Sequence, residues 1–95
     1  MSALVIVDVR ITDAAKFEEY RKRVPATLAP YGGKFLARGG RIERLEGDWD
    51  PQRIVVLEFP TLERAKAWWA SEEYRLPKRM RAESAETRMI AVESV

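Results

Sequence analysis

The sequence predicts an α+β fold in which one four-stranded antiparallel sheet carries its helices on a single face. Three observations lead to this prediction. The run 54–57, Ile-Val-Val-Leu, is apolar on both faces, as expected of a central strand. Pro60 ends that strand, and Thr61 is a suitable N-cap for a helix. A strand followed by a helix also opens the chain, so the expected order of elements is β-α-β-β-α-β.

The first strand is expected at 3–11, where apolar residues occupy both faces until Asp8 and Arg10 make one face polar. Thr12 or Asp13 can cap the helix that follows. The apolar residues of this helix recur every three or four positions, at Phe17, Tyr20, Val24, Leu28 and Tyr31. Pro25 interrupts the pattern and predicts a kink or a restart of the helix.

A short second strand is expected at 34–38. The pair Gly39-Gly40 then predicts either a tight hairpin turn or a bulge within a longer strand. The segment 41–46 has a poor strand period, and 47–51 is rich in turn-forming residues. The path of the chain between the second and third strands therefore stays open.

Two helices are expected after the central strand. The first carries Leu62, Ala65 and the adjacent Trp68 and Trp69. Ser71 is a plausible new N-cap, and a short helix should continue to about residue 84, although it contains Pro77. The last strand is expected at 87–95, with apolar residues on both faces.

The helices can cover only one face of this sheet, and the second face is also apolar. Such a surface is too large to remain exposed on a monomer. A second copy of the chain packed sheet to sheet would bury it, so the sequence predicts a two-fold homodimer. A monomer with an unusually apolar sheet is the alternative.

Composition excludes several classes of function. The chain has 95 residues with no Cys and no His, which excludes disulfides, thiolate metal sites and a Ser-His-Asp triad. The net charge of +2 is too small to indicate nucleic acid, and the third strand lacks the aromatic motif of RNA-recognition sheets. There is no signal-peptide pattern and no membrane-spanning stretch, so we expect a soluble cytoplasmic protein with one domain over 1–95.

Four stretches together resemble the domain of unknown function 1330 family: YGGKFLARGG (31–40), EGDWDPQRIVVLEFP (46–60), AKAWWASEEY (65–74) and RMIAVESV (88–95). The resemblance covers the whole chain and implies a ferredoxin-like fold assembled as a dimeric α/β barrel. It places the chain beside the antibiotic-biosynthesis monooxygenases and muconolactone-isomerase-like proteins, and implies no particular reaction. Family members commonly end in V-E-G, where this chain has Ser94, and Pro77 stands where a helix former is expected.

Arg38 is the first candidate site residue, because it ends a strand beside two glycines and Arg binds carboxylates or enolates well. Its alternative is a surface Arg next to a turn. Asp8 interrupts an apolar strand and could pair with Arg38 or Arg10, or act as a base with a raised pKa. A structural ion pair or a polar dimer contact is the alternative for Asp8.

Aromatic residues form the second group of candidates. Trp69 continues the apolar stripe of its helix and is expected in the core, which leaves Trp68 and Tyr74 to line a cavity between helices and sheet. Plain packing is the alternative for both. Tyr20 is either a core residue with a satisfied hydroxyl or a catalytic acid. Arg81 lies where the resemblance implies an Arg before the last strand. The alternative is that Arg81 lies on a solvated helix face and has no role in a site.

Two classes of function follow. The first is a cofactor-free enzyme or binding protein for a small anionic or aromatic metabolite. In it Arg38 fixes the anion, Asp8 or Tyr20 moves a proton, and Trp68 and Tyr74 form an apolar wall. The second is a non-catalytic dimeric module with structural or regulatory roles. An open cavity with Arg38 directed into it favours the first class, and a filled space favours the second.

Overall fold

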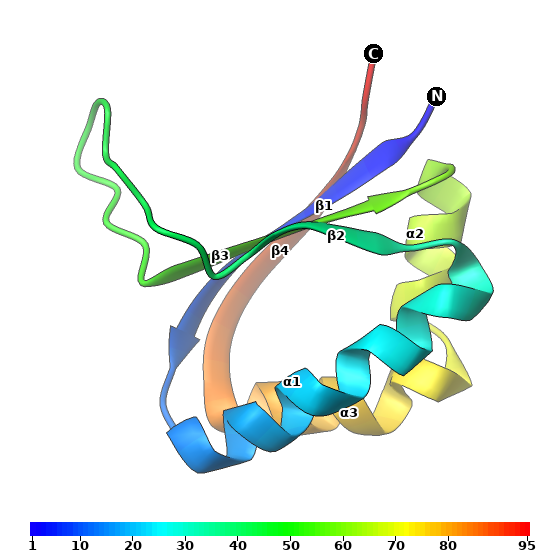
Figure 1. The fold of residues 1–95 in the computed structure, drawn as a ribbon, viewed down its shortest axis with the longest axis horizontal. Coiled ribbons are helices and arrows are strands. Elements are labelled where there is room, and N and C mark those ends of the chain that lie inside the picture. Colours follow the sequence, from blue (N-terminus) through cyan, green and yellow to red (C-terminus); the bar gives the residue numbers. More distant parts are fainter.

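The computed structural model describes residues 1–95 and has the predicted order of strands and helices (Figure 1). The elements are β1 (Ala3–Ile11), α1 (Ala14–Leu28), a 3₁₀ turn (Ala29–Tyr31), β2 (Lys34–Arg38), β3 (Arg53–Phe59), α2 (Leu62–Trp69), α3 (Glu72–Ser84) and β4 (Ala85–Glu93). The last strand thus begins earlier than the sequence predicts and follows α3 directly. Residues 94 and 95 lie outside it.

The four strands form one sheet in the order β2-β3-β1-β4, and every neighbouring pair is antiparallel. The two strands that the sequence marks as apolar on both faces, β1 and β3, are the central ones. Val7 of β1 lies opposite Val55 of β3 on one side and Met89 of β4 on the other. Strands β2 and β4 are therefore the edge strands.

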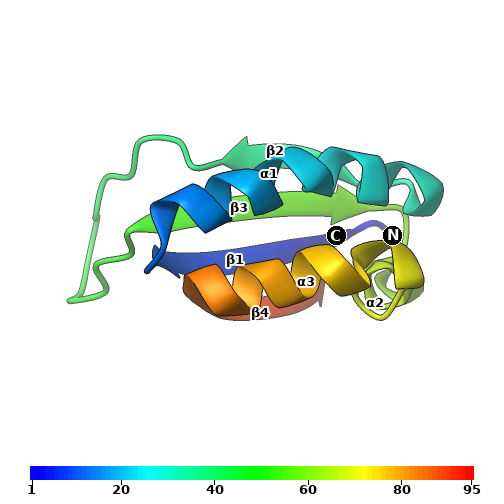
Figure 2. The same cartoon turned by 90° about the horizontal axis from the view of Figure 1, so that it is seen from below.

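All three helices cover the same face of the sheet (Figure 2). Alternate residues of β1 point to them, and Val5, Val7 and Val9 are each less than 5% exposed. The stripe predicted for the first helix supplies the other half of the core, together with Trp68 and Tyr74 from the later helices. This confirms the α+β class and the single helical layer.

Side chains at the expected positions begin the helices. Asp13, Thr61 and Ser71 each accept a hydrogen bond from the backbone N–H three residues later. Pro25 does not restart the first helix, because α1 continues from Ala14 to Leu28. The helix then tightens into the 3₁₀ turn and ends at Gly32, whose φ of 72° is in the left-handed region.

The connection from β2 to β3 is a long loop, residues 39–52, with no strand in it. Neither a tight hairpin nor a bulge within a strand occurs at Gly39-Gly40, because β2 ends at Arg38. The one irregularity in the pairing of β2 with β3 lies between Phe35 and Ala37. Trp49 of this loop bends back to the sheet and donates a hydrogen bond of 3.1 Å from Nε1 to Asp8 Oδ2.

The face of the sheet opposite the helices carries mostly aliphatic side chains. Ile90 is 62% exposed and Val92 is 44% exposed, and Leu4, Ile6, Ile54 and Val56 are only partly buried. Ion pairs flank this apolar centre, Asp8–Arg88 at one end and Lys34–Glu58 at the other. No helix of the structure has the length and apolar character needed to span a membrane.

Candidate functional site

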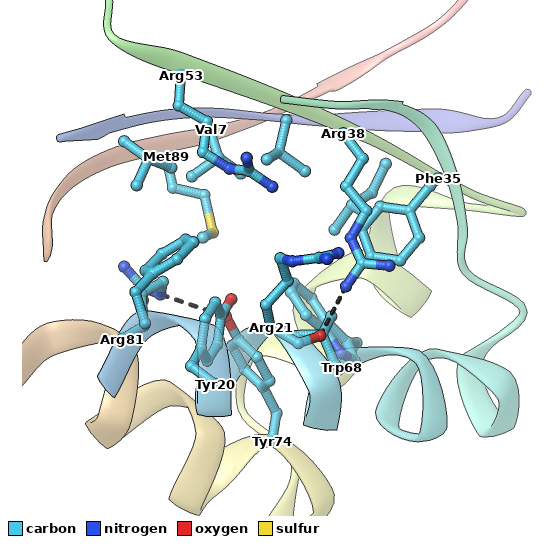
Figure 3. A pocket seen from close by; sticks show the side chains of 15 residues that line it. Val7, Tyr20, Arg21, Phe35, Arg38, Arg53, Trp68, Tyr74, Arg81 and Met89 are labelled. Atoms are coloured by element: carbon cyan, nitrogen blue, oxygen red, sulfur yellow. Dashed lines mark hydrogen bonds between the residues drawn. The ribbon is translucent and has the colours of Figure 1, made fainter. Parts of the chain in front are cut away.

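A small cavity lies between the helices and the sheet, with a volume of about 30 Å³ (Figure 3). This is room for one or two water molecules. Its floor consists of alternate residues of β1 and β3, including Val7, Val9 and Val55, and its roof consists of aromatic and aliphatic side chains from α1 and α2. Four arginines interrupt this apolar lining: Arg21, Arg38, Arg53 and Arg81.

Arg38 is held by an acceptor that a proline makes available. Pro25 has no N–H, so the carbonyl of Arg21 lacks its usual partner in the helix. Nη2 of Arg38 donates to that carbonyl at 2.6 Å, and its guanidinium lies 4.2 Å from the centre of the Phe35 ring. Pro25 therefore directs a side chain of β2 across the gap toward α1, where Figure 3 shows it at the cavity.

Arg53 enters the cavity from the first position of β3. Its Nε is buried and has no hydrogen-bond partner, and its guanidinium carbon lies 5.6 Å from the centre of the Phe17 ring. Gly39 allows this approach, because a Cβ at that position would overlap the Arg53 guanidinium. Gly39 thus does permit a close approach, whereas Gly40 faces open space, and the group that approaches is an arginine of the same chain.

No carboxylate lines the cavity, so its positive charge is not neutralised there. Burial lowers the pKa of Arg38, and the nearby charges of Arg21 and Arg53 lower that pKa further. Arg21 has an acidic partner, Glu18 at 3.2 Å, but that carboxylate is on the outer surface of α1. An anion between these guanidinium groups would relieve their repulsion and give Arg53 an acceptor.

A hydrogen-bonded chain of side chains closes the other side of the cavity. Arg81 donates from Nε to the Tyr74 hydroxyl at 3.3 Å, and from Nη1 to the Thr87 hydroxyl. The hydroxyls of Tyr74 and Tyr20 are 2.8 Å apart. Only one of the two hydroxyl hydrogens is used in this bond, so the other is left to bind a further acceptor.

Tyr20 keeps its proton in this environment. Burial raises the pKa of Tyr20 above its ordinary value, and the neighbouring Tyr74 raises it further. Tyr20 is therefore a hydrogen-bond donor and not a base at neutral pH. Apart from Tyr74, the other ionisable groups in the lining are arginines, so the cavity is equipped to bind and polarise an anion, and it contains no ready proton acceptor.

The prediction for the adjacent tryptophans is wrong for Trp69. Trp68 is the core residue, 1% exposed, with its ring centroid 4.1 Å from that of Tyr74 and its Nε1 donating to Thr27 at 3.0 Å. Trp69 is 48% exposed and packs against the ammonium group of Lys78. The short α2 packs on the sheet through Ala65 and Trp68, which are its buried residues.

Asp8 does not belong to the cavity, and the predicted pairing with Arg38 or Arg10 is wrong. Asp8 alternates with Val7 and Val9 and therefore points to the other face of the sheet. There it accepts hydrogen bonds from Arg88 at 2.7 Å and from Trp49. This corresponds to the structural ion pair that the sequence left open as the alternative.

The remaining predicted residues come together around one space. Tyr20, Arg38, Trp68, Tyr74 and Arg81 all line the cavity, from four different elements. Their functional roles stay predictions. No group of three or more His, Cys, Asp or Glu side chains is placed to hold a metal ion.

Sequence reasoning missed Arg53 and Arg21. The signal for Arg53 was the strand period, because Arg53, Val55, Leu57 and Phe59 share one face and two of them are clearly core residues. Arg21 offered a weaker signal. It lies one residue beyond the apolar stripe position of Tyr20, and it is close to the cavity only because β2 approaches α1.

The fold and the cavity define a ferredoxin-like α+β protein with a cationic pocket under its helices. The model of the family Domain of unknown function (DUF1330) matches residues 2–95, so the chain belongs to that family. No protein with a curated description matches the sequence.

Solved structures with the same fold are distant in sequence. A protein of unknown function from Rhodopseudomonas palustris superposes with a TM-score of 0.78 at 18% identity, covering 99% of this chain and 82% of that one. A dimeric ferredoxin-like protein of unknown function from Thermobifida fusca has a TM-score of 0.68 at 16% identity, covering 99% and 92%. A putative antibiotic biosynthesis monooxygenase from Nitrosomonas europaea has a TM-score of 0.66 at 15% identity, covering 100% and 99%.

Proposed function

We propose that this protein binds a small organic anion, such as a carboxylate or an enolate, in the cavity between its helices and its sheet. The observation that carries the proposal is the charge of the lining, because four arginines and no carboxylate surround an apolar space. The unpartnered Nε of Arg53 and one free tyrosine hydroxyl hydrogen supply the donors.

Polarisation of the bound anion is the chemistry that this arrangement supports. Guanidinium and phenol donors stabilise negative charge on oxygen, which would favour an enolate over its ketone. Because Asp8 lies on the other face and Tyr20 stays protonated, the proton acceptor for any reaction has to come with the substrate. Binding is thus the primary role, and Arg38, Arg53 and Tyr20 are the residues that contact the anion.

A thermal-shift titration with benzoate tests this proposal. A ligand at one hundred times its dissociation constant adds about 2.7 kcal/mol to the free energy of unfolding. Benzoate should stabilise the wild-type protein, and the neutral isostere benzamide should not. Arg38→Ala and Arg53→Met should abolish the benzoate response, and Arg79→Ala, at an exposed position of α3, should retain it. Equal responses to benzoate and benzamide, or a response that survives both cavity variants, would exclude an anion site here.

Assembly as a homodimer, with the two sheets packed face to face, is the second part of the proposal. The exposed aliphatic side chains on the far sheet face support it, together with the description of the Thermobifida fusca neighbour as dimeric. Ile6→Arg, at the centre of that face, should convert a dimer to a monomer in analytical ultracentrifugation. Leu76→Arg, on the exposed side of α3, should leave the dimer intact.

A dimeric module without a ligand is the alternative function, and the small volume of the cavity favours it. The same measurements distinguish the two functions. A protein that sediments as a dimer and shows no stabilisation by any organic acid fits the module, whereas stabilisation that depends on Arg38 fits the binding protein.

A further inference from the structure

A second hollow lies on the helical side of the sheet, a groove of about 560 Å³ between α2 and β4. It exists because β4 is an edge strand and α2, with eight residues, does not cover it fully. Ala91 points to the helical face, opposite the buried Val5 of β1, yet it is exposed. Most of the groove lining is hydrophobic, and Lys66 and Arg81 are its only charged residues.

Three side chains are common to the groove and the cavity: Trp68, Arg81 and Met89. Trp68 is fixed by its hydrogen bond to Thr27, and Arg81 by its bonds to Tyr74 and Thr87. Met89 has no polar anchor, and its flexible thioether is suited to move. Figure 3 shows its sulfur directed from β4 toward the helices, at the wall of the cavity. Met89 is therefore the movable side chain in the wall that separates the cavity from the groove.

The two volumes differ in what they can hold. The cavity, at about 30 Å³, has room for a group the size of a carboxylate, whereas ligand sites in proteins typically measure about 300–1,000 Å³. The groove falls within that range. A ligand of metabolite size thus needs both spaces, with its charged end at the arginines and its apolar part elsewhere.

We propose that the groove between α2 and β4 holds the apolar body of the ligand, whose anionic head lies at Arg38 and Arg53, and that Met89 moves aside to connect the two spaces. The ligand class is then a monoanion with an aromatic or alkyl body, and not a small polar anion such as phosphate. This inference rests on the proposed function, because it assigns the head group to the arginine cavity.

Isothermal titration with two acids tests the inference, with biphenyl-4-carboxylate as the long probe and acetate, which fits the cavity alone, as the short one. Ala91→Trp fills the groove at an exposed position, so it should fold normally. It should weaken binding of the long probe roughly tenfold or more, since a displaced ring loses its buried area, and should change acetate binding less than about twofold. Leu76→Trp, which touches neither space, is the matched control and should change neither affinity.

Met89 gives a second, independent readout. Met89→Ala removes most of the side chain between the cavity and the groove and should accelerate association of biphenyl-4-carboxylate in stopped-flow measurements, with acetate unaffected. If the long probe depends on Arg38 and Arg53 but not on Ala91 or Met89, the groove inference fails and the anion site stands. If neither acid responds to the arginine variants, both fail. Phosphate binding as tightly as the acids would also overturn the assignment of ligand class.

Discussion

Replacing Arg53 with Met should make the protein more stable while it removes anion binding. Arg53 buries an Nε–H without a partner, which costs about 1–3 kcal/mol relative to a satisfied donor. It also lies close enough to Arg38 to lower the pKa of that residue, so the two charges repel each other. A residue that destabilises the free protein in this way is expected at a binding site.

The magnitude follows from what the substitution keeps and loses. Met retains the apolar stem of the side chain and its packing. The contact with Phe17, at 5.6 Å, is lost and is worth about 0.5–1 kcal/mol. The net gain is about 1 kcal/mol, which for a domain of this size raises Tm by about 4–8 °C.

Thermal unfolding at one fixed protein concentration measures this change, because a dimer makes Tm depend on concentration. Arg79→Met, at an exposed site on α3, is the control and should shift Tm by much less. A loss of more than about 1 kcal/mol in Arg53→Met, with benzoate binding retained, would contradict the reasoning, since Arg53 would then be a structural residue with a satisfied guanidinium.

Three further predictions concern the surroundings of the cavity. Pro25→Ala restores a backbone N–H that competes with Arg38 for its carbonyl acceptor, so calorimetry should show weaker benzoate binding in a protein of equal or higher Tm. An unchanged affinity would mean that Pro25 does not position Arg38. Trp68→Ala should cost about 3–5 kcal/mol in urea denaturation, and Trp69→Ala about 1 kcal/mol or less, because only Trp68 is buried. Equal losses would contradict the assignment of the core. Burial raises the pKa of Tyr20 in the folded protein above the value of 10.0 expected in the unfolded chain. The stability that the protonated Tyr20 contributes is therefore complete below about pH 10 and is lost as the pH rises above that value. Stability measured against pH should fall above about pH 10 by up to roughly 1.4 kcal/mol per unit, and less steeply in Tyr20→Phe.

The sequence was sufficient for the order of elements because local signals and the global fold agree. The apolar runs of β1 and β3, the caps at Asp13, Thr61 and Ser71, and the helical stripe of α1 all indicate the same arrangement. The boundaries were less certain, as the early start of β4 illustrates. α3 and β4 meet without a loop, so no turn residue marks the change.

The faces of the elements were harder to assign than the elements themselves. β1 is apolar on both faces, so the alternation of its residues does not indicate which face the helices cover. For this reason Asp8 was predicted to share a site with Arg38 on the helical side, whereas it lies on the opposite face of the sheet. Trp68 and Trp69 are neighbours on a helix of two turns, and the rotation of that helix is decided by its contact with the sheet. Both errors have the same origin, because tertiary packing selects between two faces that are locally equivalent.

The arginine cluster illustrates a different limit. Arg21, Arg38 and Arg53 come from three different elements. From the sequence, Pro25 indicates that one helix carbonyl lacks its usual donor, but it does not indicate which side chain will donate to that carbonyl. The glycine beside Arg38 correctly indicated a close approach, although the approaching group was not a ligand. The charge of the cavity is thus a property of the assembled fold, and no single stretch of sequence contains it.

A crystal structure of the protein grown with 4-bromobenzoate would test the anion site most directly, because anomalous scattering locates the bromine without ambiguity. We expect the carboxylate between the guanidinium groups of Arg38 and Arg53, with an oxygen accepting from Arg53 Nε and the ring directed toward Met89. Bromine peaks only on the outer surface at saturating concentration, with the arginines unmoved, would contradict the assignment of this cavity as the binding site.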